Sequence, residues 1–562
     1  MRNRGPRLQP LVRLPPDPLV ADCVAPALTY NPFMHRRNLL QAGLTALAPQ
    51  SVPLRAQRAP ASDRLRRVVA SEITSLDPQR PTGSLTAELG PELFAGLTAF
   101  DAQGRLVPGV AASWSSSADG LRWTFKLRAS QTWSDGRALT ARDVVYSLQR
   151  MLAPETAARE AERLLAIQNA REVQLARLAP GRLGVSAPAP DQVVIDLTRP
   201  EVGLPMMLSA AYCVPEHVIS VRGREWAKPE FMVCNGPYRV ETWAPGAKVI
   251  NLRRNAKYPD AAQVRIERVD WLTGYDDATR LRLFRLGEAD VATIEDASNL
   301  VLARREMPQR LRTAPESAVG WIGLHAGRKP LDDPRLRRAL SLAVDRRVLA
   351  EKVRGLGEAP SDSALPLGLP DYPTPALPDY AAWPMPQRIA AARELMRAAR
   401  TAAGGAPLRL TVGYPAGPTL RKVFLAVSAM WKVLGVETEL PPLDGRAYTA
   451  ALLKGQFDVF SYSTFALVPT AGVFLDRFAS DSPVNVSFYR SAAFDTALRS
   501  AVSQTTAAGR TAEYRRAEAQ LLRDLPIIPL YRGVSNRLIA ARVSGWTDHP
   551  GHSHPSRFLT FA

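Results

Sequence analysis

The sequence has little cysteine and histidine, and it lacks long apolar runs and the common catalytic signatures. Three cysteines among 562 residues exclude a disulfide-dense scaffold. No run of about 18 apolar residues occurs, which excludes a bundle of membrane-spanning helices. There is no Gly-x-Ser-x-Gly elbow, no Gly-x-x-x-x-Gly-Lys loop, no Gly-x-Gly-x-x-Gly and no His-Glu-x-x-His motif. These absences argue against the enzyme classes that use those motifs.

What remains is an ordinary globular composition with a strong positive charge. Apolar residues make up 46% and charged residues 22% of the chain, and the formal net charge is +19. Arginine and alanine are abundant throughout, so the charge reflects a compositional bias. Since no basic run is interleaved with aromatic residues, and no Cys/His finger spacing occurs, we expect no nucleic-acid partner. The length predicts several domains with clefts between them.

The N-terminal segment has the pattern of an export signal. Residues 1–33 are rich in proline and have no period, which indicates an unstructured extension, or an untranslated stretch if synthesis starts at Met34. In residues 34–58, the pair Arg36-Arg37 precedes an apolar stretch that is too short to cross a bilayer of about 30 Å. The segment resembles a twin-arginine signal, which predicts export to the periplasm.

Export gives the cysteines two possible states. Cys23 would be removed with the leader, whereas Cys213 and Cys234 would remain in an oxidising compartment. A single disulfide between Cys213 and Cys234 would stabilise the fold by roughly 3 kcal/mol on the chain-entropy model. Two buried thiols are the alternative, and the residues alone do not choose between these states.

A histidine cluster near the C-terminus is a candidate for a metal site. His549, His552 and His554 lie within six residues, a grouping that suits a borderline divalent metal. The proline and glycine among them indicate a surface loop, where such a grouping is often incidental. We therefore predict no metal and no other cofactor.

Beyond the N-terminal segment, strand and helix patterns alternate, which predicts an α/β protein built around mixed sheets. Apolar and polar residues alternate over 121–127, as in a half-buried strand. Thr140 and Asp143 resemble a capping box in front of a helix, and Asp333 before a proline predicts another helix start. The proline-rich segment 359–386 has no period and is predicted to be an extended surface arm.

A family resemblance rests on residues 133–150, WSDGRALTARDVVYSLQR. This block resembles the signature of the peptide/nickel class of extracellular solute-binding proteins of ABC importers, and the oligopeptide-binding proteins look most similar. Further blocks agree in order and spacing, at residues 75–78, 108–114, 235–238, 333–340 and 527–531. The resemblance spans about residues 65 to 562.

The resemblance implies a periplasmic-binding-protein-like clamp with two lobes and an additional inserted domain. The implied limits are 64–93, 191–317 and 534–562 for lobe I, 94–190 for the inserted domain and 318–533 for lobe II. The lobes would close on a peptide or peptide-like solute and deliver it to the permease subunits of an ABC importer in the inner membrane.

The resemblance also implies how the ligand is held, as an extended peptide with backbone hydrogen bonds to both lobes. By register, the binding segments fall at Thr82, Gly83 and Ser84 in lobe I, and at Ser463, Thr464 and Phe465 in lobe II.

The sequence departs from its relatives at the charged positions of this site. The acidic residue that pairs with a peptide's α-amino group would fall at Leu467, and the basic residues toward the other terminus at Leu452 and Ser461. An ammonium buried without its partner carries a desolvation cost of several kcal/mol. Leu467 beside Phe465 and Val468 suggests an apolar wall, so we predict a ligand that depends less on a charged N-terminus. A modified peptide, a less charged solute, another peptide register and a slip of the alignment stay open.

Three other functions stay open at this point. They are a metal or metallophore receptor of the same class, a periplasmic peptide hydrolase whose site leaves no local motif, and a sensory partner of a signalling receptor.

Overall fold

The computed structural model describes residues 63–80, 85–402, 407–441, 443–466, 469–504, 506–551 and 553–562. The predicted N-terminal extension and export signal lie outside these residues. The compact unit Ala61–Ala562 contains all of them. None of the helices described in it combines the length and the apolar character needed to cross a membrane.

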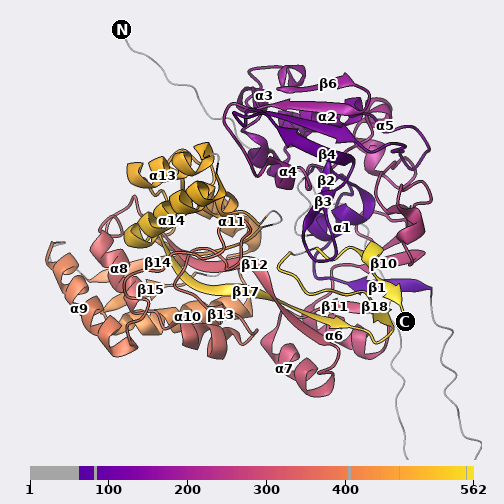
Figure 1. The fold of residues 1–562 in the computed structure, drawn as a ribbon. Helices are drawn as coiled ribbons and strands as arrows, with labels where there is room; N and C mark the ends of the chain where they lie inside the picture. The colour runs from indigo at the N-terminus through magenta and orange to yellow at the C-terminus, as the bar shows by residue number, and fades with distance from the viewer. Residues whose placement is uncertain are drawn as a thin grey trace, which may run out of the picture. The chain divides into compact units, whose positions relative to one another are not determined.

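Eleven of the described strands form one large mixed sheet (Figure 1). They are β1 (Arg64–Val68), β8 (Tyr238–Thr242), β9 (Val249–Arg254), β10 (Arg268–Leu272), β11 (Val291–Thr293), β12 (Leu311–Leu324), β13 (Ala359–Pro360), β14 (Leu408–Gly413), β15 (Val436–Glu439), β16 (Val459–Phe465) and β17 (Ile527–Ile539). Their order is β15-β14-β16-β12-β17-β11-β1-β10-β9-β8, and β13 pairs with β17 off this path. Because β1 and β14 make parallel pairs and the other pairs are antiparallel, the predicted α/β class with mixed sheets is confirmed.

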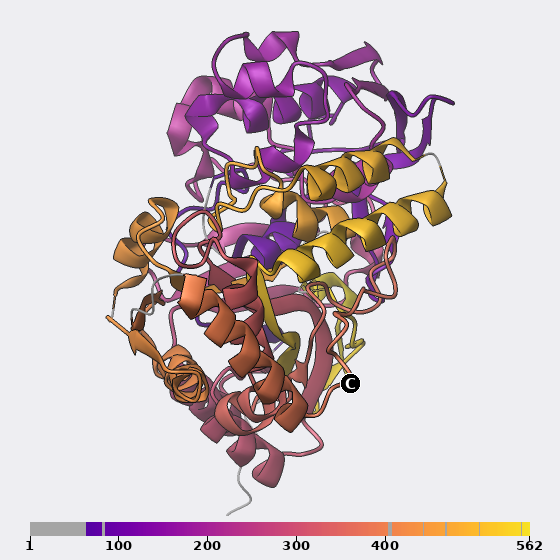
Figure 2. The same cartoon turned by 90° about the vertical axis from the view of Figure 1, so that its left-hand side faces the viewer.

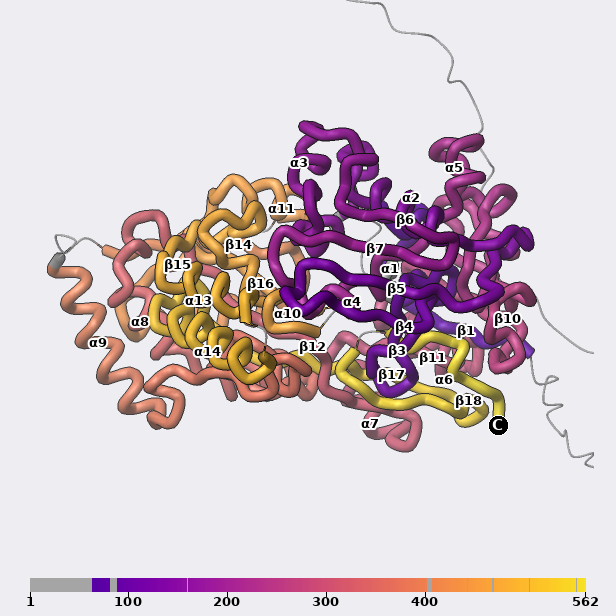
Figure 3. Tube along the Cα trace, turned by 45° about the horizontal axis from the view of Figure 1, so that its top comes forward, coloured from indigo at the N-terminus to yellow at the C-terminus, as the bar shows by residue number. Residues whose placement is uncertain are grey.

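A separate antiparallel sheet is built from residues 111–196. Its strands, in the order β4-β5-β7-β6, are β4 (Ala111–Ser116), β5 (Arg122–Leu127), β6 (Val185–Ala189) and β7 (Gln192–Asp196), and their traces run side by side in Figure 3. Helix α2 (Ala141–Leu152) covers this sheet with its apolar face, in which Val144 and Leu148 pack into the same core as Phe125. The inserted domain is predicted to end at residue 190, whereas strand β7 of this sheet covers Gln192–Asp196. The domain limits themselves stay a prediction.

Two further strand pairs are short. They are β2 (Thr98–Phe100) with β3 (Leu106–Pro108), and β18 (Val543–Ser544) with β19 (Thr560–Phe561). The remaining α-helices are α1 (Leu85–Leu93), α3 (Ala170–Gln174), α4 (Leu204–Met207), α5 (Glu216–Arg222), α6 (Asp277–Arg285), α7 (Ala297–Glu306), α8 (Pro334–Leu342), α9 (Met385–Ala402), α10 (Pro418–Lys432), α11 (Gly445–Leu453), α12 (Ala471–Leu475), α13 (Ala492–Ser503) and α14 (Ala507–Asp524). Helices α13 and α14 pack against each other, as Figure 2 shows.

Both predicted helix starts are confirmed. The backbone N–H of Thr140 donates to the Asp143 carboxylate at 2.8 Å, which closes the capping box of α2. The side chain of Asp333 accepts from the N–H of Arg335 at 2.8 Å and caps α8. Such caps satisfy backbone donors that have no partner within the helix, which is why they mark helix starts in a sequence.

The two longest strands, β12 and β17, run side by side and connect the two ends of the large sheet (Figure 1). Their pairing is irregular between Pro315 and Val319, which lie opposite Val534 and Arg532. The predicted crossings between the lobes, at 317/318 and 533/534, fall within this irregularity.

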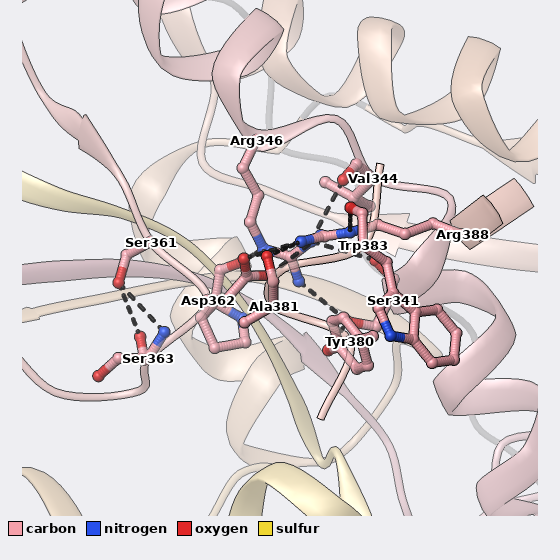
Figure 4. Close-up of polar contacts among 11 residues, drawn as sticks. Ser341, Val344, Arg346, Ser361, Asp362, Ser363, Tyr380, Ala381, Trp383 and Arg388 are labelled. Atoms are coloured by element: carbon pink, nitrogen blue, oxygen red, sulfur yellow. Dashed lines mark hydrogen bonds and ion pairs between the residues drawn. The ribbon is translucent and has the colours of Figure 1, made fainter. Parts of the chain in front are cut away.

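The proline-rich segment 359–386 is held by buried polar contacts, so the prediction of a surface arm is wrong. The carboxylate of Asp362 accepts two hydrogen bonds from Arg388, at 3.2 and 3.1 Å, and forms an ion pair with Arg346 at 3.0 Å (Figure 4). Further along, Tyr372 is fully buried and its hydroxyl donates to Glu518 on α14 at 2.8 Å. All three partners lie outside the segment, and Glu518 is 146 residues from Tyr372, so these contacts leave no period within the segment.

The two cysteines of the described chain are free thiols, so the disulfide that was one of the two predicted states is not formed. Cys213 lies in the core beneath the four-stranded sheet, and Cys234 lies in another core around β1 and β8 to β10, where its thiol donates to the Tyr238 carbonyl at 3.3 Å. Burial raises the pKa of both thiols, that of Cys234 to about 12. The chain brings each cysteine into a different core, which prevents pairing.

Candidate ligand-binding site

Strand β16, which carries the predicted lobe II segment, has an open edge. On one side it pairs with β12 from Val459 to Phe465. On the other side β14 pairs only with Val459 and Phe460. Among the strands that the structure describes, none covers residues 461–464 on that side.

The register between β12 and β16 determines which backbone groups face this open edge. The N–H of Ala466 donates to the Ser317 carbonyl at 2.9 Å, in the same register as the pair of Thr464 with Val319. In an antiparallel pair, successive residues direct their N–H and C=O groups to opposite sides of the strand. Even-numbered residues of β16 therefore bond to β12, and residues 461 and 463 direct their backbone groups away from it.

A tyrosine occupies the first of these outward positions. The hydroxyl of Tyr448 on α11 donates to the carbonyl of Ser461 at 2.5 Å, and its ring stacks on Phe457. Tyr448 is buried, and burial raises the pKa of its hydroxyl. The next outward residue, Ser463, is exposed. An extended chain lying beside β16 is thus offered a backbone donor and acceptor at Ser463.

A pocket of about 430 Å³ lies beside this edge. Its described lining residues are Glu295, Trp321, Arg354, Pro415, Thr419, Leu420, Val423, Phe424, Tyr448, Leu452, Ser461, Tyr462, Ser463, Leu530 and Tyr531. They come from β12, β16, β17, α10, α11, the π-helix Val348–Arg354 and the segments after β11 and β14, so the tertiary fold assembles the pocket from distant parts of the chain.

The lining of the pocket combines aromatic and aliphatic side chains with polar groups. Phe424 is buried and its ring stacks on Tyr414, with centroids 5.5 Å apart. Arg354 is the one cation among the described lining residues. Its guanidinium donates to Glu358 at 2.6 Å and lies over the ring of Tyr531, 4.4 Å from the centroid. The positive charge of Arg354 is therefore already balanced within the protein.

The predicted site residues have different places relative to this pocket. Ser461 and Ser463 line it, and so does Leu452. Thr464 pairs with Val319, and Phe465, with 39% of its surface exposed, pairs with Ala318. Thr82, Gly83, Ser84 and Leu467 lie outside the described residues, so their placement in the site stays a prediction.

The C-terminal histidines that the structure describes pack against each other. The rings of His549 and His554 stack with centroids 4.2 Å apart, and Nδ1 of His549 accepts from the N–H of Gly551 at 3.0 Å. His552 lies outside the described residues. No group of three or more potential metal ligands occurs among the residues that the structure describes.

Sequence reasoning missed the aromatic walls of the pocket. Phe424 and Tyr448 are spaced like ordinary core residues, and nothing local distinguishes them from the core. Tyr531 gave the one available signal, because it belongs to the block at 527–531 that carries the family resemblance.

The sequence and the fold are similar to those of known proteins. The family described as bacterial extracellular solute-binding proteins, family 5 Middle, matches residues 105–485. The chain is 32% identical over 525 residues to the probable deoxycholate-binding periplasmic protein YgiS of Escherichia coli, covering 92% of this chain and 97% of that protein. It is 31% identical over 528 residues to the periplasmic oligopeptide-binding protein OppA of Salmonella typhimurium, covering 91% and 96%.

A similar solved structure is that of Haemophilus influenzae OppA in complex with RPPGFSPFR. It has a TM-score of 0.78 and 26% identity, and the match covers 89% of this chain and 99% of that one. The predicted periplasmic-binding-protein-like fold is confirmed by this likeness.

Proposed function

The chain belongs to the bacterial extracellular solute-binding proteins, family 5, and on this premise we propose that it binds a peptide as an added strand on the open edge of β16. It is a periplasmic solute-binding protein rather than an enzyme. Delivery of the bound peptide to the permease subunits of an ABC importer is part of the proposal.

The observation that carries the proposal is the outward-facing backbone of Ser463 beside the apolar pocket. Main-chain hydrogen bonds give affinity for an extended peptide whatever its side chains, and a neighbouring pocket adds selectivity. The relative from Salmonella typhimurium is an oligopeptide-binding protein, and the structure from Haemophilus influenzae holds RPPGFSPFR, which support a peptide as the ligand here.

We propose that the ligand closes the protein about a hinge in β12 and β17. The irregular pairing between Pro315 and Val319 interrupts the ladder where the predicted lobes meet. Few residues need to change their backbone angles there, which is typical of hinges between packed lobes. Thr82, Gly83 and Ser84 are proposed to supply the second set of backbone contacts, and Leu467 is proposed to replace the acid that holds a peptide amine.

For export, we propose the twin-arginine route through residues 34–58. Its support is the pair Arg36-Arg37 before a short apolar stretch. Replacing both arginines by lysine is expected to keep the protein in the cytoplasm, as measured by cell fractionation. Unchanged recovery from the periplasm would contradict this route.

Mass spectrometry of molecules released from the purified protein, followed by calorimetric titration, tests the proposed ligand. We expect to find released peptides. Synthetic peptides should bind one to one and raise the thermal midpoint as their concentration increases. At a hundred times the Kd, the free energy of unfolding should increase by about 2.7 kcal/mol. N-acetylated and free peptides should bind with similar affinity, because Leu467 offers no charge to an amine. Titration of deoxycholate in parallel identifies a non-peptide receptor, and binding of deoxycholate without binding of any peptide would overturn the proposal. Peptide turnover above the blank would contradict a pure binding role.

A further inference from the structure

We propose that the pocket beside β16 selects an uncharged, aromatic or large aliphatic side chain of the bound peptide, and that Leu452 is the residue that sets this preference. The inference rests on the proposed function, since it concerns one side chain of a peptide held at the same strand edge.

The pocket and the strand edge are continuous. Ser461 and Ser463 both line the pocket, and both direct their backbone N–H and C=O groups toward the open edge of β16. A peptide that bonds to Ser463 lies beside the pocket, because Ser463 is one of its lining residues. Because side chains of an extended chain alternate between two faces, one of its side chains is placed at the pocket while its neighbours point away.

The chemistry of the walls favours an apolar guest. Ten of the fifteen described lining residues are aromatic or aliphatic, proline included. The side chains of Trp321 and Tyr462 point to the face of the sheet opposite to Ser461 and Ser463, which leaves eight for the wall. Phe424 and Leu530 are almost completely buried, and Leu452 is half-buried at the end of α11. An apolar side chain that enters removes its own surface and part of this wall from water, which is the main source of affinity in such pockets.

The charges around the pocket disfavour a charged guest. Arg354 is held by Glu358, whose side chain is 4% exposed, so a ligand carboxylate would have to compete with an existing buried partner. Glu295 accepts from Arg280 at 2.8 Å, and 65% of its side chain is exposed, so water screens its charge. A carboxylate in the pocket would lose part of its water without gaining a free counter-charge, and an ammonium would gain only the water-screened charge of Glu295.

Leu452 is the position at which this selectivity is decided. The family resemblance places a basic residue there, whereas this chain has a leucine that faces the pocket. Its neighbour Leu453 does not line the pocket and has 59% of its surface exposed. The two leucines end the same helix, so they form a matched pair for mutation.

The test uses alanine-based peptides in which one position carries Phe, Leu, Asp or Lys, and this position is moved along the peptide. At the position that enters the pocket, wild-type protein should bind the Phe and Leu peptides about tenfold or more tightly than the Asp and Lys peptides. Leu452→Arg should reduce that preference about tenfold and improve binding of the Asp peptide, whereas Leu453→Arg should leave all affinities unchanged. Thermal unfolding of both variants shows that they are folded.

The outcomes separate the two proposals. If wild-type protein binds no peptide, the proposed function fails together with the inference. If it binds every peptide with equal affinity, or if Leu452→Arg behaves like Leu453→Arg, the inference fails while the proposed function stands. If Leu452→Arg does not fold, Leu452→Ala replaces it as the test. Leu452→Ala should weaken binding of the Phe peptide without improving binding of the Asp peptide. Unchanged binding of the Phe peptide would overturn the inference.

Discussion

The open edge of β16 predicts different consequences for proline at Ser463 and at Thr464: the first should weaken peptide binding and the second should lower the stability of the fold. Ser463→Pro removes an N–H that points away from β12, so the β12–β16 ladder keeps its bonds. The loss falls on the peptide, which forfeits one backbone hydrogen bond of about 0.5–1.5 kcal/mol, or about 2- to 12-fold in affinity. The proline ring also projects toward the ligand, so the larger value is expected.

Thr464→Pro removes an N–H that serves the ladder to Val319. The carbonyl left without its donor costs about 1–3 kcal/mol of stability, in addition to strain from the proline ring. Calorimetric titration with a peptide measures the first effect, and urea unfolding measures the second. Ser463→Ala, which keeps the N–H, is the control and should bind like wild type. If Ser463→Pro binds peptide like wild type, or if Ser463→Ala weakens binding as strongly as proline does, the strand-addition reasoning is refuted.

Three further predictions concern charges and thiols. Asp362→Asn leaves two buried guanidinium groups without their carboxylate and should lower the free energy of unfolding in urea by about 3–5 kcal/mol; a loss below about 1 kcal/mol would contradict this. Part of Asp476 is exposed to solvent. Desolvation of its carboxyl group and the negative charge of Glu201 nevertheless raise the pKa of Asp476 to about 7. A raised pKa means that the folded state holds the proton more tightly, so this group reduces stability as the pH rises from about 4 to 8. Asp476→Asn should therefore raise the thermal midpoint at pH 8 more than at pH 4, and an equal change at both values would count against it. Because Cys213 and Cys234 are free, dithiothreitol should leave the thermal midpoint unchanged, whereas a lower midpoint would reveal a disulfide.

The sequence by itself determined the local structure and the family. Thr140 with Asp143, and Asp333 before a proline, marked helix starts correctly because a cap is formed within a few residues. The alternation over 121–127 predicted a strand that forms as β5, because one face of it packs into a core. The block at 133–150 carried the resemblance, and the match of family 5 over residues 105–485 confirmed it.

Only the tertiary structure decided where the ligand edge and its pocket lie. The edge exists because β14 ends its pairing at Phe460 while β12 continues to Phe465, a difference in length between strands that are distant in sequence. In the same way, the separation of Cys213 from Cys234 and the anchoring of segment 359–386 through the buried Tyr372 follow from long-range contacts. A local sequence pattern shows which residues can form a strand. It does not show how long the neighbouring strand is when that neighbour is distant in the sequence. The edge of β16 is open because its neighbour β14 is paired over fewer residues than β12.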